Sequence, residues 1–249
     1  METRDSLQSF ADKWLVAWPE QEVLRVFAPE SERLKMLAWG ALLFELQNCL
    51  FALEHEPVRE QKTLWWSQEL QMMSSQSARH PISQALQHLS AGFAELSTPM
   101  LSLLTQIPLR AGNAQQIIAM LQPFAEVLAD CEHSLFSGTQ MSRPDNIAVQ
   151  LLVMRLPHGI QAFDRAMIPM NLLARHQSLD SLNNAQALKH DWLIELQNVL
   201  LTPDTGNWFR AAQTAFTRRR IRQLGKSERL RIHPGHAWDA WRAMRLRVV

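Results

Sequence analysis

One segment of the sequence places polar side chains on an otherwise apolar helix, where they could do chemistry. In residues 31–54 the apolar side chains go almost all the way round, which is typical of a helix buried in a larger core. At 100° per residue, Glu45 and Asn48 share a face with small residues such as Ala41. A buried glutamate must be paired, protonated or bound to a cation. Glu45 therefore either lines a ligand site or pairs with an arginine of a neighbouring helix.

A second candidate site, for a metal ion, is formed by Glu126 and Asp130. These residues stand four apart and share a helix face, which would suit a cation if the face lined a cavity and is otherwise a solvated face. His233 and His236 flank a Pro-Gly pair, and this spacing fits either a metal site or a polar turn. The Cys-Glu-His run at 131–133 is poor ligand geometry, because adjacent residues of a helix point to different sides.

The helix that carries Glu45 resembles the first signature helix of the squalene and phytoene synthases. Arg33-Leu-Lys-Met-Leu-Ala-Trp39 is similar to the family stretch in which an Ala-Trp pair precedes an Asp-Asp-x-x-Asp cluster. Without gaps that cluster falls on Phe44-Glu45-Leu46-Gln47-Asn48, so one carboxylate, one amide and one phenyl ring stand where the family has three acids. In the family these acids bind magnesium, which neutralises the departing diphosphate. The resemblance thus implies an isoprenoid synthase fold with a much weakened divalent site.

The second signature of the family reads roughly Arg-Asp-x-x-x-Asp, followed by a Gly-Arg pair and a Tyr-Leu-Pro. Residues 165–176 are similar to its second half, and family spacing puts the motif's arginine on Arg155 and its aspartates on Leu156 and Ile160. The arginines Arg155 and Arg165 are kept, whereas both acids are replaced by hydrocarbon. The resemblance therefore implies that no cation is held on this side of the site.

Two weaker landmarks lie between the signatures. Trp65 and Trp66, and then His80 before a proline, resemble the family's Trp-containing helix and His-Pro helix start. Core or interface aromatics and a polar helix-entry residue would give the same pattern. The resemblance covers residues 10–225 and depends on the joint order and spacing of these motifs.

Helices are the elements that must position all these residues. Prolines punctuate the chain, and the segments between them show helical periodicity with almost no alternation of the strand type. Pro57, Pro81 and Pro144 suit first helical turns, Gly225 suits a left-handed stop, and Pro157 interrupts the second signature. The predicted helices are 5–17, 20–28, 31–54, 57–77, 81–95, 99–107, 114–137, 144–156, 158–176, 184–201, 206–224 and 235–246.

Composition supports one all-α domain. The 249 residues are 47% hydrophobic, enough for one large helical core, and eight glycines with no tyrosine leave little room for a turn-rich β protein. Two cysteines make no disulfide framework, which favours a reducing cytoplasm. The chain has no apolar run of about 18 residues and begins with polar residues, so the prediction is a soluble protein that is at most peripheral to a membrane.

Charge is distributed unevenly along the chain. Residues 210–249 carry 11 Lys or Arg against 2 Asp or Glu, while the preceding residues are acidic. We divide the chain into a synthase-like helical domain at 1–225 and a basic C-terminal extension at 226–249. The basic segment can fold back on the acidic body or dock on acidic lipid, nucleic acid or protein.

The leading interpretation is a non-catalytic member of the synthase superfamily. It predicts a single-domain helical bundle around a central, mostly apolar cavity, which acts in binding or assembly with an isoprenoid or lipid-like ligand or a protein partner. No cofactor and no nucleic acid are expected. The expected ligand-binding residues are Ala41, Glu45, Asn48, Arg155 and Arg165.

Two other classes of function stay open. One is an active prenyltransferase of the squalene or phytoene synthase type, which would use magnesium at an acidic site rearranged around Glu45, Asn48, Glu126 and Asp130. The other is an adaptor whose basic tail contacts an anionic membrane or nucleic acid. Its candidate contact residues are Arg218, Arg219, Arg220, Trp238 and Trp241.

Overall fold

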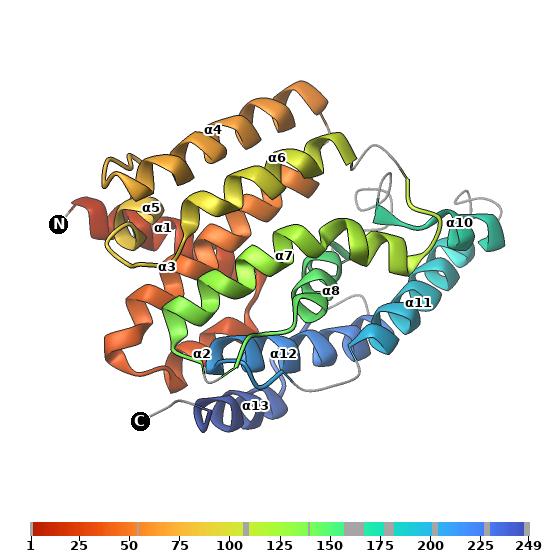
Figure 1. Cartoon of the computed structure of the whole chain (residues 1–249). Helices are drawn as coiled ribbons and strands as arrows, with labels where there is room; N and C mark the ends of the chain where they lie inside the picture. Colours follow the sequence, from red (N-terminus) through yellow and green to blue (C-terminus); the bar gives the residue numbers. More distant parts are fainter. Residues whose placement is uncertain are drawn as a thin grey trace.

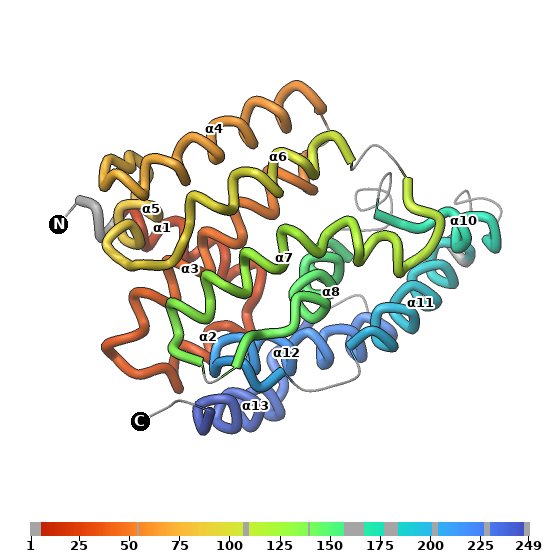
Figure 2. Tube along the Cα trace, in the orientation of Figure 1, coloured from red at the N-terminus to blue at the C-terminus, as the bar shows by residue number. Residues whose placement is uncertain are grey.

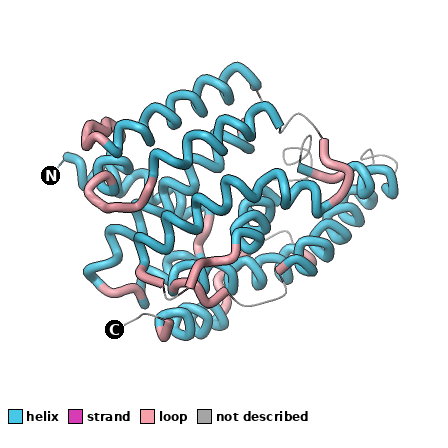
Figure 3. Tube along the Cα trace, viewed as in Figure 1, coloured by secondary structure: helices cyan, strands magenta, loops and turns pink. Residues whose placement is uncertain are grey.

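The computed structural model describes residues 2–53, 55–106, 110–138, 140–156, 167–176, 182–200, 204–226 and 230–246. Within these ranges the chain is helical with short connections and no strands (Figure 3), which confirms the predicted all-α class. The α-helices are α1 (Glu2–Ala17), α2 (Glu20–Phe27), α3 (Glu30–Gln47), α4 (Glu56–Ser74), α5 (Pro81–Leu86), α6 (Ser97–Gln106), α7 (Ala114–Phe136), α8 (Pro144–Arg155), α10 (Met170–His176), α11 (Leu182–Val199), α12 (Trp208–Leu224) and α13 (Pro234–Met244). A π-helical turn, η1 (Asn48–Ala52), follows α3, and a 3-10 turn, η2 (Phe93–Leu96), precedes α6.

The helices form layers that wrap around α3 and α7 (Figure 1). Helix α4 packs on α6, α3 packs on α1 and α5, and α7 packs on α8. The chain then crosses to α10 and α11 at the other end of the molecule and returns through α12 to α13 (Figure 2). Helix α13, which belongs to the predicted basic extension, packs on α12 and α2. No helix in the described part of the chain is long and apolar enough to span a membrane.

Helix α3 is the buried helix that the sequence predicted. Every residue from Met36 to Leu43 is buried, because apolar side chains surround this part of the helix and neighbours pack on several sides. The regular α-helix ends at Gln47, earlier than predicted, and the backbone widens into the π-helical turn η1. Asn48 is thus the first residue of the π-helical turn, where the backbone hydrogen-bond pattern changes. Such π-helical turns are frequently found at functional sites.

Proline punctuation was predicted correctly at three helix starts. Pro57, Pro81 and Pro144 each lie in a first turn, where a missing N–H costs nothing. The prediction for Gly225 was wrong: it follows Leu224 with a φ of −70°, in the right-handed region. Its N–H donates to the carbonyls of Ile221 and Gln223, so the chain leaves α12 in a tightened right-handed turn.

Two predicted helices are shorter in the structure. The helix predicted over 81–95 stops at Leu86, because the chain turns at Gly92, whose φ of 51° is left-handed, and enters η2. The helix predicted over 158–176 does not continue through Pro169, because proline lacks the N–H that a helix interior needs. Within the described part of that range, α10 begins at Met170.

Candidate functional site

A buried ion pair lies at the centre of the molecule. Arg210 of α12 and Glu132 of α7 both have no exposed surface. The arginine Nε donates to Glu132 Oε2 at 2.7 Å, and its Nη2 donates to Oε1. Oε1 also accepts the indole N–H of Trp39 at 3.1 Å, so that α3 joins the pair. The carboxylate is therefore held from two sides, and its charge is balanced by a two-pronged guanidinium.

Three glutamine side chains extend this pair into a network. Arg210 Nη1 donates to Gln150 of α8, and Gln150 Nε2 donates to Gln213 Oε1 at 3.0 Å. Gln213 and Gln21 exchange two hydrogen bonds of 2.8 Å, which connect α12 to α2. Because buried polar groups are costly without partners, this reciprocal pairing fixes the relative positions of five helices.

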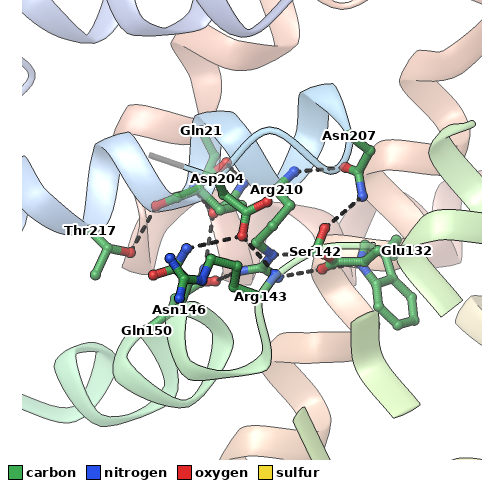
Figure 4. Close-up of polar contacts among 12 residues, drawn as sticks. Gln21, Glu132, Ser142, Arg143, Asn146, Gln150, Asp204, Asn207, Arg210 and Thr217 are labelled. Atoms are coloured by element: carbon green, nitrogen blue, oxygen red, sulfur yellow. Dashed lines mark hydrogen bonds and ion pairs between the residues drawn. The ribbon is translucent and has the colours of Figure 1, made fainter. Parts of the chain in front are cut away.

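Asp204 organises the loop that leads into α12. Its Oδ2 accepts the backbone N–H of Arg143 and the side-chain amide of Asn146, each at 3.0 Å, and its Oδ1 accepts the N–H of Gly206 at 3.0 Å. Three residues after Asp204, the side chain of Asn207 caps α12 by accepting the N–H of Arg210 at 2.8 Å. This loop therefore sets the position at which Arg210 enters the network (Figure 4).

A second buried ion pair joins α2 to α12. Arg220 is 2% exposed and Glu20 is 4% exposed, and their nearest N–O distance is 2.8 Å. The guanidinium also lies 3.7 Å from the ring centroid of Trp18, a cation–π contact. Burial lowers the pKa of Arg220, and Glu20 opposes that effect. Arg220 was predicted as a membrane or nucleic-acid contact, but it is an interior residue.

The neighbouring arginines of α12 also have internal partners. Arg218 donates to the carbonyl of Leu200 at 2.8 and 3.1 Å, and Arg219 pairs with Asp239 of α13. These arginines of α12 thus bind groups inside the protein. Helix α13, in the basic extension, packs on α12 and α2, so the described part of the extension folds back on the body, which is the first of the two arrangements that its charge allowed.

Glu45 on α3 lies near Lys13 of α1 and Lys62 of α4, and Asn48 follows it three residues later, at the start of η1. Both are partly buried, and Ala41 is fully buried. Burial raises the pKa of Glu45, and the ammonium groups of Lys13 in α1 and Lys62 in α4 oppose it. Among the described residues, the cations that act on this carboxylate are these two lysines, and no arginine pairs with it.

The second family signature begins at Arg155, at the end of α8. Helix α3 contacts α8 through a face other than the one that carries Glu45. Gln47 Nε2 donates to the carbonyl of Leu151 at 3.0 Å. Glu45 stands two residues before Gln47, about 200° round the helix, and so points away from this contact. No hydrogen bond or ion pair among the described residues joins Glu45 to Arg155.

Arg155 is buried at the last turn of α8. Arg155 is 7% exposed, and its Nε has no hydrogen-bond partner in the described structure. Burial lowers the pKa of its guanidinium. Leu156 beside it is 1% exposed. Arg165, Ile160 and Pro157 lie outside the described residues.

The remaining candidates have ordinary structural surroundings. Glu126 and Asp130 are both exposed on α7, and Glu126 accepts a 3.0 Å hydrogen bond from the amide of Gln122. His233 and His236 form a capping box at the start of α13: His233 Nδ1 accepts the N–H of Gly235 at 3.0 Å, and His236 Nδ1 accepts that of His233 at 2.9 Å. They correspond to the polar-turn interpretation of the sequence.

The His80 landmark is a helix start packed among aromatic rings. Its Nδ1 accepts the N–H of Ile82 at 3.3 Å, and its ring contacts Trp66 and Phe10 at centroid distances of 4.9 and 4.4 Å. Burial lowers the pKa of His80, and the charge of Glu69 opposes that effect. Trp66 is a core residue, whereas Trp65 is 44% exposed.

Magnesium, which the family resemblance implies, does not fit the residues at the corresponding positions. Mg²⁺ needs an octahedral set of oxygen ligands, preferably carboxylates. Leu156 offers hydrocarbon, and the single carboxylate of Glu45 is already under the influence of Lys13 and Lys62. Nowhere in the described ranges do three or more His, Cys, Asp or Glu side chains come together as they would to hold a metal ion.

Sequence reasoning missed the central ion pair, although the sequence contained a signal for it. Glu132 lies on the apolar face of α7, between Leu128 and Leu135, and Arg210 precedes a buried stripe of α12. A charged residue on an otherwise apolar face is the same signal that singled out Glu45.

Comparison with family models, curated proteins and solved structures found no match to this chain.

Proposed function

We propose that this chain is a non-catalytic protein of the squalene and phytoene synthase type, which acts in binding or assembly. The observation that supports this most directly is the chemistry at the positions that match the family's two acidic clusters. One cluster keeps a single carboxylate, Glu45, in surroundings that disfavour its charge. The other begins with the buried hydrocarbon of Leu156.

Prenyl coupling of the head-to-head type needs electrostatic support at the diphosphate leaving groups. Each departing diphosphate carries charge that magnesium ions and basic side chains must balance in the transition state. Arg155 can contribute one positive charge, but a guanidinium without acids holds no metal ion. The residues at this site therefore favour binding of an anionic or lipid-like molecule over its ionisation.

The two buried ion pairs of the interior support a structural role and not a catalytic one. The charged residues at its centre, Glu132 and Arg210, satisfy each other, as do Glu20 and Arg220. Such pairs are poor catalysts because neither partner is free to exchange a proton or bind a ligand, but they fix helix positions with high specificity. A fixed helical frame is what a binding or assembly protein needs.

Turnover of prenyl diphosphates tests the proposal. The purified chain is incubated with farnesyl or geranylgeranyl diphosphate and magnesium, and released pyrophosphate is measured against a blank without protein. We expect no release above the blank. Release that disappears in Glu45→Ala but persists in Glu60→Ala, an exposed control on α4, would reject the proposal and support an active transferase.

A further inference from the structure

Helix α13 has two chemically different faces. Its inner face consists of His236, Ala240 and Ala243, which are all buried against the body. The outer face carries Trp238, Trp241, Arg242 and Arg245, and all four are exposed. Positions 238, 241, 242 and 245 follow the three- and four-residue steps of one helix face. The exposed tryptophans are therefore a continuous feature of the surface.

The rings of the two tryptophans contact each other at the surface in a tilted arrangement. Trp238 is 59% exposed and Trp241 is 41% exposed, with ring centroids 4.8 Å apart and an interplanar angle of 32°. The guanidinium of Arg245 lies 5.2 Å from the centroid of Trp241. Tryptophan gains more than almost any other side chain from leaving water, so an exposed pair points to a partner surface.

Positive charge surrounds this pair. Asp239 is the single acid in the described part of the chain from 230 to 246, and Arg219 of α12 neutralises it. Arg231, Arg242 and Arg245 are exposed. A partner that complements this face must therefore accept indole rings and carry negative charge.

The helix that presents this face is firmly attached. The ring of His236 makes an edge contact with Phe216 of α12 at a centroid distance of 5.2 Å, and the Arg219–Asp239 pair adds a second anchor. Gly235 lies so close to Arg219 that a Cβ at this position would be 2.2 Å from its guanidinium. The tryptophan face is thus displayed by a fixed helix and not by a detached arm.

We propose that the outer face of α13 (Trp238, Trp241, Arg242 and Arg245) docks the protein on an anionic lipid surface. Indole rings favour the headgroup level of a bilayer, and arginines beside them pair with anionic headgroups. Ile232, just before α13, is 54% exposed and adds an aliphatic group that suits the hydrocarbon boundary. Stacking with bases is less well served, because Trp241 already has one neighbour in Trp238 and another in Arg245.

Vesicle flotation tests this surface. The full chain is mixed with vesicles of phosphatidylcholine alone, or with about one third phosphatidylglycerol, at low and high salt. We expect binding only to the anionic vesicles and a loss of binding as salt rises. Arg242→Gln with Arg245→Gln should lower the partition coefficient roughly tenfold or more, since each basic residue near the surface contributes about 1 kcal/mol.

The tryptophan contribution is tested by Trp238→Ser with Trp241→Ser, which should lower binding at least as much while leaving the salt dependence in place. Trp65→Ser with Arg79→Gln is the matched control, because Trp65 is 44% exposed and Arg79 is also exposed, and both belong to the α4–α5 region. All variants change exposed side chains, and an unchanged melting midpoint verifies folding.

Three outcomes would overturn the proposal. The wild-type chain could fail to float with anionic vesicles, or the α13 variants could float as well as the wild type. Alternatively, the α13 substitutions could abolish binding to a single-stranded oligonucleotide, or self-association measured by light scattering, while vesicle binding is unaffected. This third outcome would assign the face to nucleic acid, if oligonucleotide binding is lost, or to a second copy of the chain, if self-association is lost.

Discussion

The centre of the molecule pairs its ionisable side chains, whereas Glu45 on α3 and Arg155 at the end of α8 lie in separate surroundings and do not pair with each other. At the centre, Glu132 meets Arg210 with two hydrogen bonds. On α3, burial raises the pKa of Glu45. At the end of α8, burial lowers the pKa of Arg155, whose buried Nε has no partner in the described part of the chain. Buried charges that find partners fix the positions of helices, whereas a buried charge with an unsatisfied polar atom, as in Arg155, is a candidate for contact with a ligand.

The largest effect is expected from breaking the central pair. Glu132→Gln leaves the Arg210 charge buried without its counter-charge, which should cost about 3–5 kcal/mol of unfolding free energy. In a chain of this size that lowers the melting midpoint by roughly 10 °C. Chemical denaturation and thermal melting measure both quantities.

The double variant Glu132→Met with Arg210→Met is the control for this prediction. Because it removes both charges and keeps similar volume, it should regain at least half of the lost stability. A single variant as stable as the wild type would show that the central pair does not hold the fold.

The second ion pair offers a comparison between a buried and an exposed glutamate on one helix. Glu20→Gln should cost roughly 3 kcal/mol, because Arg220 would remain charged at 2% exposure. Glu22→Gln, which removes the partner of the exposed Arg25, should cost less than about 0.5 kcal/mol. Equal losses in the two variants would contradict the distinction drawn between interior and surface pairs.

Histidine titration should destabilise the fold in acid. Burial lowers the pKa of His236 below the ordinary value of 6.5, so the unfolded chain binds more protons than the folded one just below neutrality. Stability is then complete above pH 6.5 and is lost as the pH falls through the folded pKa. Protonated Nδ1 can no longer accept the His233 N–H, at a cost of about 1 kcal/mol.

The variant His236→Asn isolates this effect, because asparagine keeps an acceptor but does not titrate. The difference in melting midpoint between pH 7.5 and pH 5 should be smaller in this variant than in the wild type. An identical pH dependence in both proteins would show that protonation of His236 does not cause the loss of stability in acid.

The smallest effect concerns Glu45 and has the opposite sign. A carboxyl group with a raised pKa contributes stability below its unfolded pKa and loses it as pH rises through the folded pKa. Glu45→Gln should therefore raise the unfolding free energy at pH 7, by less than about 1 kcal/mol since solvent reaches the side chain. At pH 4 the gain should vanish. Destabilisation at pH 7 would show that Lys13 and Lys62 outweigh the burial of the carboxylate.

Much of the fold could be predicted from the sequence, because helix signals are local. Prolines at first turns marked the starts of α4, α5 and α8, and the 3.6-residue periodicity located most helices, although several predicted helices were too long. The apolar surroundings of residues 36–43 identified α3 as buried. Local geometry without a sequence signal was missed, as in the π-turn at Asn48–Ala52 and the right-handed turn at Gly225.

The candidate site could be predicted only in part, because partners of buried charges are distant in sequence. Glu132 and Arg210 are 78 residues apart, and Glu20 and Arg220 are 200 apart. A charged residue on an apolar face signals that it needs a partner but does not say which one. Glu45 and Glu132 carry the same local signal, but Glu45 was selected because it falls on the family's first signature, whereas Glu132 lies outside both signatures.

The magnesium dependence of diphosphate binding tests the central claim most directly. The melting midpoint is measured with farnesyl diphosphate in the presence of magnesium or of a chelator. We expect the same midpoint in both conditions, with any stabilisation lost in Arg155→Gln. A magnesium-dependent rise of about 5 °C or more at saturating ligand, abolished by Glu45→Gln, would contradict it.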